Sequence, residues 1–217
     1  QERGEPRKFG MLLQDIVGIE ALVNRVVVHM PLKQQMEWIQ ETYSQFEIDN
    51  LVIVGGESSK QKYPGPTVNQ SLEKISQDNR VRENSILCGG ICIPSRKKES
   101  KNLIRKSECG AEFFTTQVLC DSDNVIKMIK NYQERCDKVN TFPRRILLSF
   151  APVSSQKNID FLKWLGVEIP KDTERYLNGR PGSMTERSLD VAIEVLNEIL
   201  AFITKNNLKV PVGLNVE

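Results

Sequence analysis

The 217-residue chain contains little histidine, few aromatic residues and no long apolar segment. His29 is its only histidine, so the second Cys/His pair that a structural zinc site needs is missing and no metal is expected. No apolar run approaches the roughly 18 residues of a membrane-spanning helix. The opening residues QERGEPRKFG lack the apolar centre of a secretory signal peptide. The sequence therefore indicates neither a membrane protein nor a secreted one.

A strong excess of charge is also absent. The chain has 30 Lys and Arg against 28 Asp and Glu, which gives a net charge of +2. This is too small for a general nucleic-acid binder, which usually carries a basic stripe. The five cysteines are an odd number, and several lie in apolar runs: Cys88, Cys92, Cys109, Cys120 and Cys136. We expect them to be reduced thiols in the core of a cytoplasmic protein rather than a disulfide framework.

Short β-branched segments alternate with helix-length segments along the whole chain. We expect strands at 25–30, 50–56, 85–93, 111–119, 145–153 and 210–216. We expect helices at 9–17, 33–46, 67–76, 98–109, 122–136, 158–165 and 184–205. This alternation is typical of parallel strands joined by helical crossovers. It leaves two α/β architectures, a doubly wound sheet and a (β/α)8 TIM-type barrel.

Two features favour the barrel. No G-x-G-x-x-G follows a predicted strand, which weakens a dinucleotide-binding doubly wound sheet. Polar residues follow the predicted strands, at His29, Glu57, Gln117 and Ser154, and in a barrel all such carboxyl ends open at one mouth. We therefore expect one (β/α)8 barrel domain over residues 1–217. Because about six strands are visible, we expect the first one or two strands to be absent from this chain.

Four residues at these strand ends could hold a flat heterocycle. Glu57 follows Gly56, and a carboxylate there can accept two hydrogen bonds from the aminopyrimidine edge of a pterin. Gln117 can both donate and accept, Phe150 could stack on a ring, and His29 at the same mouth could contact a cofactor or substrate. A solvated carboxylate, a core amide and a structural histidine are the alternatives.

A basic helix supplies the second candidate group. Asn102, Arg105 and Lys106 recur at helical spacing, so their side chains could reach one phosphate-sized anion. A solvated basic helix face explains the same pattern, and an anionic folate tail could use the same charges.

One segment carries a family resemblance. In 103–121 (LIRKSECGAEFFTTQVLCD) a basic helix end is followed by a Gly-Ala turn and by a strand that ends in Thr-Gln before an acidic residue. This order resembles methylenetetrahydrofolate reductase, a (β/α)8 barrel. The segments NLVIVGGE, FLKWLGVEIP and ERSLDVAIEVLNEIL are similar to further parts of that family. The resemblance extends over about residues 25–217.

The resemblance implies an activity and a set of contacts. It implies an oxidoreductase of one-carbon metabolism that reduces 5,10-methylenetetrahydrofolate to 5-methyltetrahydrofolate with FAD as the flavin. It assigns the folate to Glu57 and Gln117, and we add Phe150 as a candidate stacking residue of the same site. It assigns the flavin to His29, Gly56, Tyr63, Asn102, Arg105 and Lys106. NAD(P)H as electron donor and assembly into a homo-oligomer stay open.

The chain also departs from the family pattern. Gly55 stands where the family has an arginine, and Tyr63-Pro64-Gly65-Pro66 replaces a tyrosine-alanine loop that touches flavin. The family's catalytic acid lies on a first strand that this chain does not show, so the catalytic residue is unknown. Two alternatives follow. One is a module that binds methyltetrahydrofolate, or passes its methyl group to a partner, without flavin chemistry. The other is a barrel enzyme with an unrelated substrate.

Overall fold

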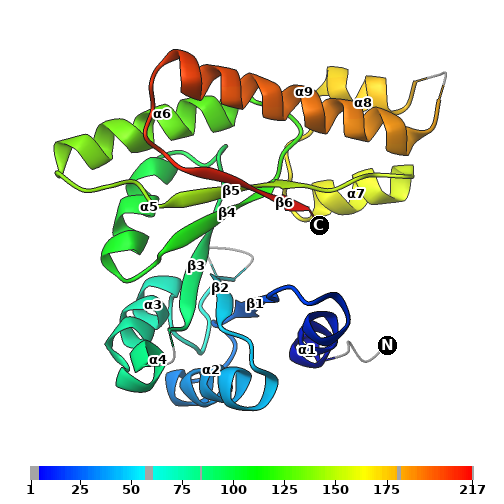
Figure 1. Cartoon of the computed structure of the whole chain (residues 1–217). Coiled ribbons are helices and arrows are strands. Elements are labelled where there is room, and N and C mark those ends of the chain that lie inside the picture. Colours follow the sequence, from blue (N-terminus) through cyan, green and yellow to red (C-terminus); the bar gives the residue numbers. More distant parts are fainter. Residues whose placement is uncertain (1–4, 57–60, 84, 180–181, 217) are drawn as a thin grey trace. The chain divides into compact units, whose positions relative to one another are not determined.

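The computed structural model describes residues 5–56, 61–83, 85–179 and 182–216, apart from the side chain of residue 82. It has an α/β fold in which helices alternate with the strands of one parallel sheet (Figure 1). The strands are β1 (Leu22–Val26), β2 (Asn50–Val54), β3 (Leu87–Cys92), β4 (Phe113–Val118), β5 (Arg145–Phe150) and β6 (Val212–Val216). The helices are α1 (Pro6–Val17), α2 (Leu32–Phe46), α3 (Val68–Gln77), α4 (Asn79–Glu83), α5 (Glu99–Glu108), α6 (Asp123–Lys138), α7 (Gln156–Trp164), α8 (Lys171–Leu177) and α9 (Met184–Lys205).

The strand order decides between the two predicted architectures. The strands follow one another in the sheet in chain order, β1-β2-β3-β4-β5-β6. A doubly wound sheet reverses its order at a switch point, whereas successive strands of a (β/α) barrel lie beside their chain neighbours. The α/β prediction of the barrel type is therefore confirmed. Within the described residues, no helix is both long enough and apolar enough to cross a bilayer.

The first strand differs from its prediction. It covers Leu22–Val26 rather than 25–30, because the chain turns at 28–29, directly after Val27 donates its N–H to Val54 O of β2 at 3.0 Å. His29 consequently lies in the turn after β1. The chain also has two short helices that the pattern did not predict, α4 and α8.

The chain forms two compact units. The first comprises Gln1–Ile91 and Arg105–Phe114, and the second comprises Cys92–Ile104 and Thr115–Glu217. Whether residues 1–217 act as one domain stays a prediction. In the first unit the core consists of fully buried aliphatic side chains from α2, β2, α3 and the connection before β2: Ile39, Ile48, Leu51, Ile53 and Leu72. Burying one such side chain stabilises a fold by about 1.5–3 kcal/mol.

Arg7 fastens α1 to α2 in the first unit. Its side chain is buried, and its guanidinium lies 4.5 Å from the centroid of the Trp38 ring and 4.6 Å from that of Phe46. The same group forms a two-pronged ion pair with Glu5 at 2.9 and 3.2 Å. It also lies 3.4 Å from Glu41 Oε2 on α2. A cation between two aromatic faces is stabilised by the ring quadrupoles as well as by the carboxylates.

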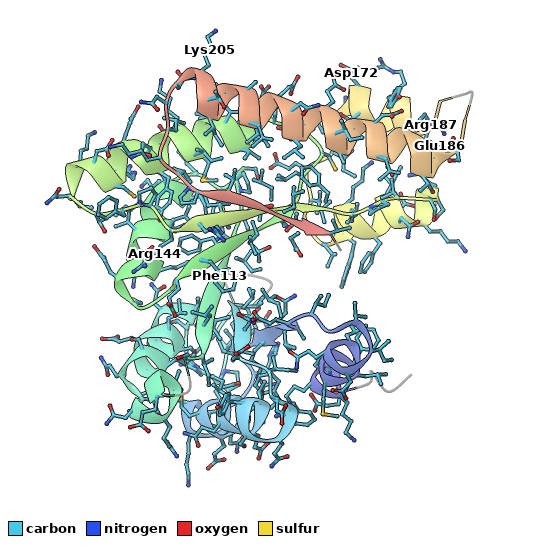
Figure 2. All side chains as sticks on the ribbon, in the orientation of Figure 1. Phe113, Arg144, Asp172, Glu186, Arg187 and Lys205 are labelled. Carbon is cyan, nitrogen blue, oxygen red and sulfur yellow. The ribbon has the colours of Figure 1, made fainter. Side chains whose placement is uncertain are left out.

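The second unit has its own apolar cluster between β4, α7 and α8. Its buried members are Val118, Val153, Ile159, Leu162, Val167 and Leu177. Arg187, near the start of α9 (Figure 2), closes this cluster by donating two hydrogen bonds to Leu177 O at 2.9 and 2.8 Å. Ser183 and Glu186 form a capping box that begins α9. Arg187 therefore ties the start of α9 to the end of α8 through side-chain to backbone hydrogen bonds.

Candidate functional site

Three of the predicted residues meet after β1 and β2 in the first unit. The His29 ring contacts the Tyr63 ring edge-on, with centroids 5.6 Å apart and planes at 73°. Tyr63 also covers Gly56, where a Cβ atom would lie 2.2 Å from the tyrosine ring. The structure thus brings His29, Gly56 and Tyr63 together, and their role toward a flavin stays a prediction. Glu57, the predicted pterin-binding carboxylate beside them, lies outside the described residues.

Gly65 explains how Tyr63 is held there. Its N–H donates to Val28 O at 2.8 Å, and a Cβ atom at this position would lie 2.4 Å from Met30 O. Only glycine fits so close to the turn after β1. The segment that replaces the family's flavin loop is therefore pinned against the end of β1.

The carboxylate of Glu99 organises the start of α5 in the second unit. Its side chain is 1% exposed. It accepts hydrogen bonds from Ile93 N–H at 3.1 Å and from Asn102 Nδ2 at 2.9 Å, and it pairs with Arg96 at 3.5 Å. A buried carboxylate needs such donors, because an unpaired one is costly. Asn102 is therefore committed to a neighbour on its own helix.

The other two predicted residues of α5 belong to the first unit. Lys106 donates from Nζ to Ile91 O on β3, and its stem packs 3.5 Å from the position of a Cβ at Gly90. Arg105 is exposed. The amide of Asn102 and the ammonium of Lys106, which the resemblance assigns to flavin, thus already serve internal acceptors. The residues present on α5 therefore fit the pyrophosphate of FAD poorly.

Gln117 lies at the carboxyl end of β4 in the second unit. Its Nε2 donates to Leu165 O in the connection after α7 at 3.0 Å. Within the described part of the chain, its Oε1 has no hydrogen-bond donor. Gln117 therefore has a fixed amide plane whose acceptor is available to a ligand.

A polar layer lies on the same sheet face as Gln117. Thr115 Oγ1 and Ser149 Oγ are 3.0 Å apart, and Asn215 Nδ2 donates to Ser149 Oγ at 3.0 Å. Because side chains alternate along a strand, Gln117 shares the face of Thr115, whereas Phe150 lies on the face opposite Ser149. Phe150 is 7% exposed and shares its face of β5 with the buried residues Ile146 and Leu148. This geometry gives its predicted stacking role no support.

A shallow hollow surrounds Gln117. It is lined by residues from the ends of β3 and β4 and from the connection between α7 and α8, including Pro94, Ser95, Asp121, Asn124 and Glu168. It combines an amide acceptor with two carboxylates. An aminopyrimidine presents clustered N–H donors and would be matched by such a set. Sequence reasoning did not select Glu168, whose one signal was its place in the family-like segment FLKWLGVEIP.

Cys120 lines the same hollow, but its thiol is a poor nucleophile. Burial and the neighbouring Asp121 raise the pKa of its thiol to about 11. Burial likewise raises the pKa of Cys88 to about 12. Thiols with such pKa values stay protonated at neutral pH and are poor nucleophiles. The hollow is therefore equipped for hydrogen bonding rather than for covalent catalysis by cysteine.

Comparison with known proteins identifies one family and one similar solved structure. The sequence profile of the family described as methylenetetrahydrofolate reductase matches residues 92–210. No curated protein matches the chain. A solved structure described as an uncharacterized protein from Clostridium thermocellum that binds two copies of 5-methyl-5,6,7,8-tetrahydrofolic acid is similar, with a TM-score of 0.79. It is 20% identical, and the match covers 100% of this chain and 72% of that one.

A second solved structure is much less similar. The carboxyl transferase domain of Rhizobium etli pyruvate carboxylase has a TM-score of 0.47 at 11% identity, over 96% of this chain and 39% of that one. At this level the match carries no argument. The first structure supports the fold, and the family profile covers more than half of the chain.

Proposed function

Because the chain belongs to the methylenetetrahydrofolate reductase family, we propose that it binds a reduced folate of the methyltetrahydrofolate type. The edge of the pterin ring would lie against Gln117 at the carboxyl end of β4, because the hollow there, about 30 Å³, is too small to enclose the ring. The observation that carries this proposal is the arrangement of Gln117, whose Nε2 is anchored on Leu165 O while Oε1 points to no donor of the described chain. Support also comes from the folate ligand of the similar Clostridium thermocellum protein.

The residues divide the work of binding. Gln117 Oε1 would accept a hydrogen bond from an N–H of the pterin, and its anchored Nε2 would keep the amide from rotating. Asp121 and Glu168 would accept from the remaining N–H donors. Each such hydrogen bond to a charged acceptor contributes about 1.5–3 kcal/mol. Glu57 remains a proposed further contact.

The second candidate function is flavin-dependent reduction of the methylene group to a methyl group. Membership of the reductase family favours it, since the matched residues 92–210 include α5. When bound, a flavin supplies the hydride for this reduction. The internal hydrogen bonds of Asn102 and Lys106 count against it. We therefore rank folate binding without flavin chemistry first.

The folate proposal is tested by calorimetry with 5-methyltetrahydrofolate. We expect Gln117→Ala to weaken binding by about 1–3 kcal/mol, because the pterin N–H would lose its buried acceptor. Gln77→Ala, an exposed amide at the end of α3, is the matched control and should bind as the wild type does. Equal affinity of the wild type and Gln117→Ala would contradict this placement of the pterin.

Flavin binding is tested on the same protein. We expect the purified chain to be colourless and to take up no added FAD in a spectrum recorded near the flavin band at about 450 nm. A yellow protein that loses its colour when Arg105 and Lys106 are both replaced by alanine would reverse the ranking of the two functions.

A further inference from the structure

One face of α9, the 22-residue helix drawn in orange to red in Figure 1, is apolar and exposed. Apolar side chains recur along this face at alternating spacings of four and three residues: Leu189, Ile193, Leu196, Leu200 and Ile203. We call these five residues the α9 seam. Leu189, Ile193 and Leu200 are 46%, 57% and 39% exposed. Single exposed leucines are ordinary on a protein surface, but a continuous apolar row marks a surface that a partner covers.

The seam differs from the face of α9 that supports the fold. Val195 and Ile199 are buried, and α9 packs against α6 and α8. Glu198 lines a hollow together with residues of α8. Because Glu198 follows Leu196 by two residues, it points about 200° away from Leu196 around the helix. The helix therefore has two apolar faces, and only one of them is buried within the described part of the chain.

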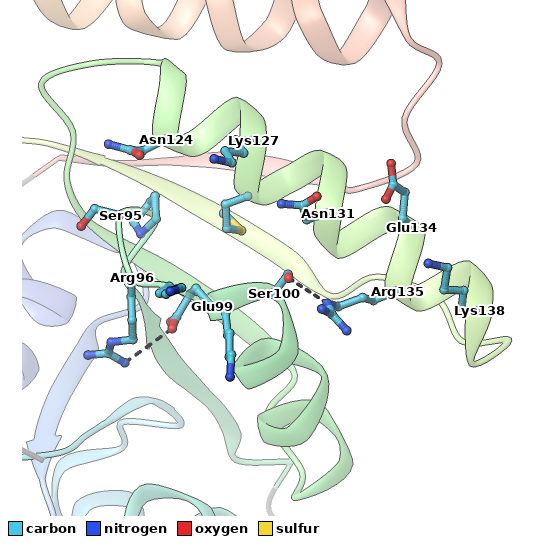
Figure 3. Close-up of a pocket in the computed structure, with 14 residues that line it drawn as sticks. Ser95, Arg96, Glu99, Ser100, Asn124, Lys127, Asn131, Glu134, Arg135 and Lys138 are labelled. Carbon is cyan, nitrogen blue, oxygen red and sulfur yellow. Dashed lines mark hydrogen bonds and ion pairs between the residues drawn. The ribbon is translucent and has the colours of Figure 1, made fainter.

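The elements beneath α9 hold the seam in place. Arg187 at the start of α9 donates two hydrogen bonds to Leu177 O at the end of α8, at 2.9 and 2.8 Å. The neighbouring helix α6 is tied to α5 by the hydrogen bond from Arg135 Nε to Ser100 Oγ at 2.9 Å (Figure 3). A surface that is already ordered loses little conformational freedom when a partner binds.

The spacing of the seam specifies a helix as the partner. Apolar residues at alternating intervals of four and three occupy the a and d positions of a heptad repeat, and such side chains pack into the holes between side chains of a second helix. The seam extends over about 21 Å, or two heptads. It has leucine or isoleucine at every a and d position, so an identical seam is a suitable partner.

The charges along α9 select an orientation. The first half of the helix carries exposed acidic residues, Glu186, Asp190 and Glu194. Exposed basic residues, Lys205 and Lys209, lie at and just after its end. Two copies of α9 in parallel would bring like charges together at both ends, whereas an antiparallel pair brings each acidic half beside a basic end. The opposed helix dipoles favour the same orientation.

We propose that the α9 seam is the interface of a homodimer, in which α9 packs antiparallel against α9 of a second copy of this chain. The inference goes beyond the proposed folate function and does not depend on it.

The test is sedimentation of the full chain over a range of concentrations. We expect a monomer–dimer equilibrium with a dissociation constant of about 10 µM, since the seam offers less than the roughly 800 Å² per partner of a typical stable interface. Ile193→Lys and Leu200→Lys each place a charge in the seam and should weaken the dimer at least about thirtyfold. The matched control is Ala201→Lys, an exposed position of the same helix outside the seam, which should dimerise as the wild type does. Circular dichroism confirms that each variant is folded.

The orientation is tested with a short bismaleimide cross-linker. In an antiparallel pair, Leu196 lies near the two-fold axis, whereas the two copies of Leu189 are about 20 Å apart. Leu196→Cys should therefore cross-link to its own copy, and Leu189→Cys should give no more dimer than the wild type, whose natural thiols set the background.

Three results would overturn the proposal. A wild type that stays monomeric up to about 100 µM would exclude the homodimer. Wild-type dimerisation by both Ile193→Lys and Leu200→Lys would place the interface away from the seam. Efficient cross-linking of Leu189→Cys to its own copy would show a parallel pair.

Discussion

Replacing Arg7 with alanine is expected to lower the free energy of unfolding by about 3 kcal/mol. The variant removes a buried cation from between Trp38 and Phe46 and leaves the carboxylates of Glu5 and Glu41 without their partner. Urea unfolding followed by tryptophan fluorescence measures the change, because Trp38 lies against the deleted group. Arg7→Lys should fall between the two proteins, since an ammonium cannot form the forked pair with Glu5.

Lys8→Ala is the control for this prediction, because Lys8 is the neighbouring exposed cation on the same helix. It should stay within about 0.5 kcal/mol of the wild type. The effect of Arg7 should also depend on pH. Its hydrogen bonds hold the pKa of Glu5 below the ordinary value. The contribution of the pair is therefore present at neutral pH and lost as the pH falls through the lowered pKa. A wild-type stability for Arg7→Ala would show that α1 is not fastened through this side chain.

Replacing Glu99 with alanine is the second change with a large expected effect, about 2–4 kcal/mol. The loss arises because Ile93 N–H and the Asn102 amide, both partly buried, would lose their acceptor. Chemical unfolding gives the free energy, and amide hydrogen exchange at Ile93 reports the local opening. Glu99→Gln keeps the shape but turns an NH2 group toward a donor, so it should be intermediate.

Glu108→Ala provides the comparison, since Glu108 is an exposed carboxylate at the end of the same helix. We expect a change of no more than about 0.5 kcal/mol. If Glu99→Ala and Glu108→Ala unfold at the same denaturant concentration, the carboxylate of Glu99 does not organise the start of α5.

Periodicity and turn residues predicted much of the fold. The alternation of strands and helices predicted a barrel-type α/β sheet, and the strand order confirms that prediction. The first strand was misplaced because Val27 and Val28 continue a β-branched run, whereas their burial comes from the turn that Gly65 packs against. Hydrophobic pattern cannot distinguish these two causes of burial.

The candidate site was predictable only where neighbours in the chain become neighbours in space. Helical spacing placed Asn102 on one face of α5 with Arg105 and Lys106. Glu99 lies one turn earlier on the same helix and accepts the hydrogen bond of the Asn102 amide. Phe150 alternates with Ser149 and so lies off the polar face of β5, but alternation does not reveal which face is polar until the contacts of Ser149 are known. Glu168 joins Gln117 through a connection far away in the chain, and no local pattern predicts that meeting.

The hydrogen bond from Gln117 Nε2 to Leu165 O gives one side chain two roles. An amide at position 117 would serve the ligand through its acceptor and the connection after α7 through its donor. In that connection Gly166 adopts a φ of 84°. A glutamate there would keep the acceptor but lose the hydrogen bond to Leu165 O. A lysine would keep a donor for Leu165 O but lose the acceptor. Measuring all substitutions at position 117 could thus separate ligand binding from the geometry of the connection after α7, because each of the two roles tolerates a different set of residues.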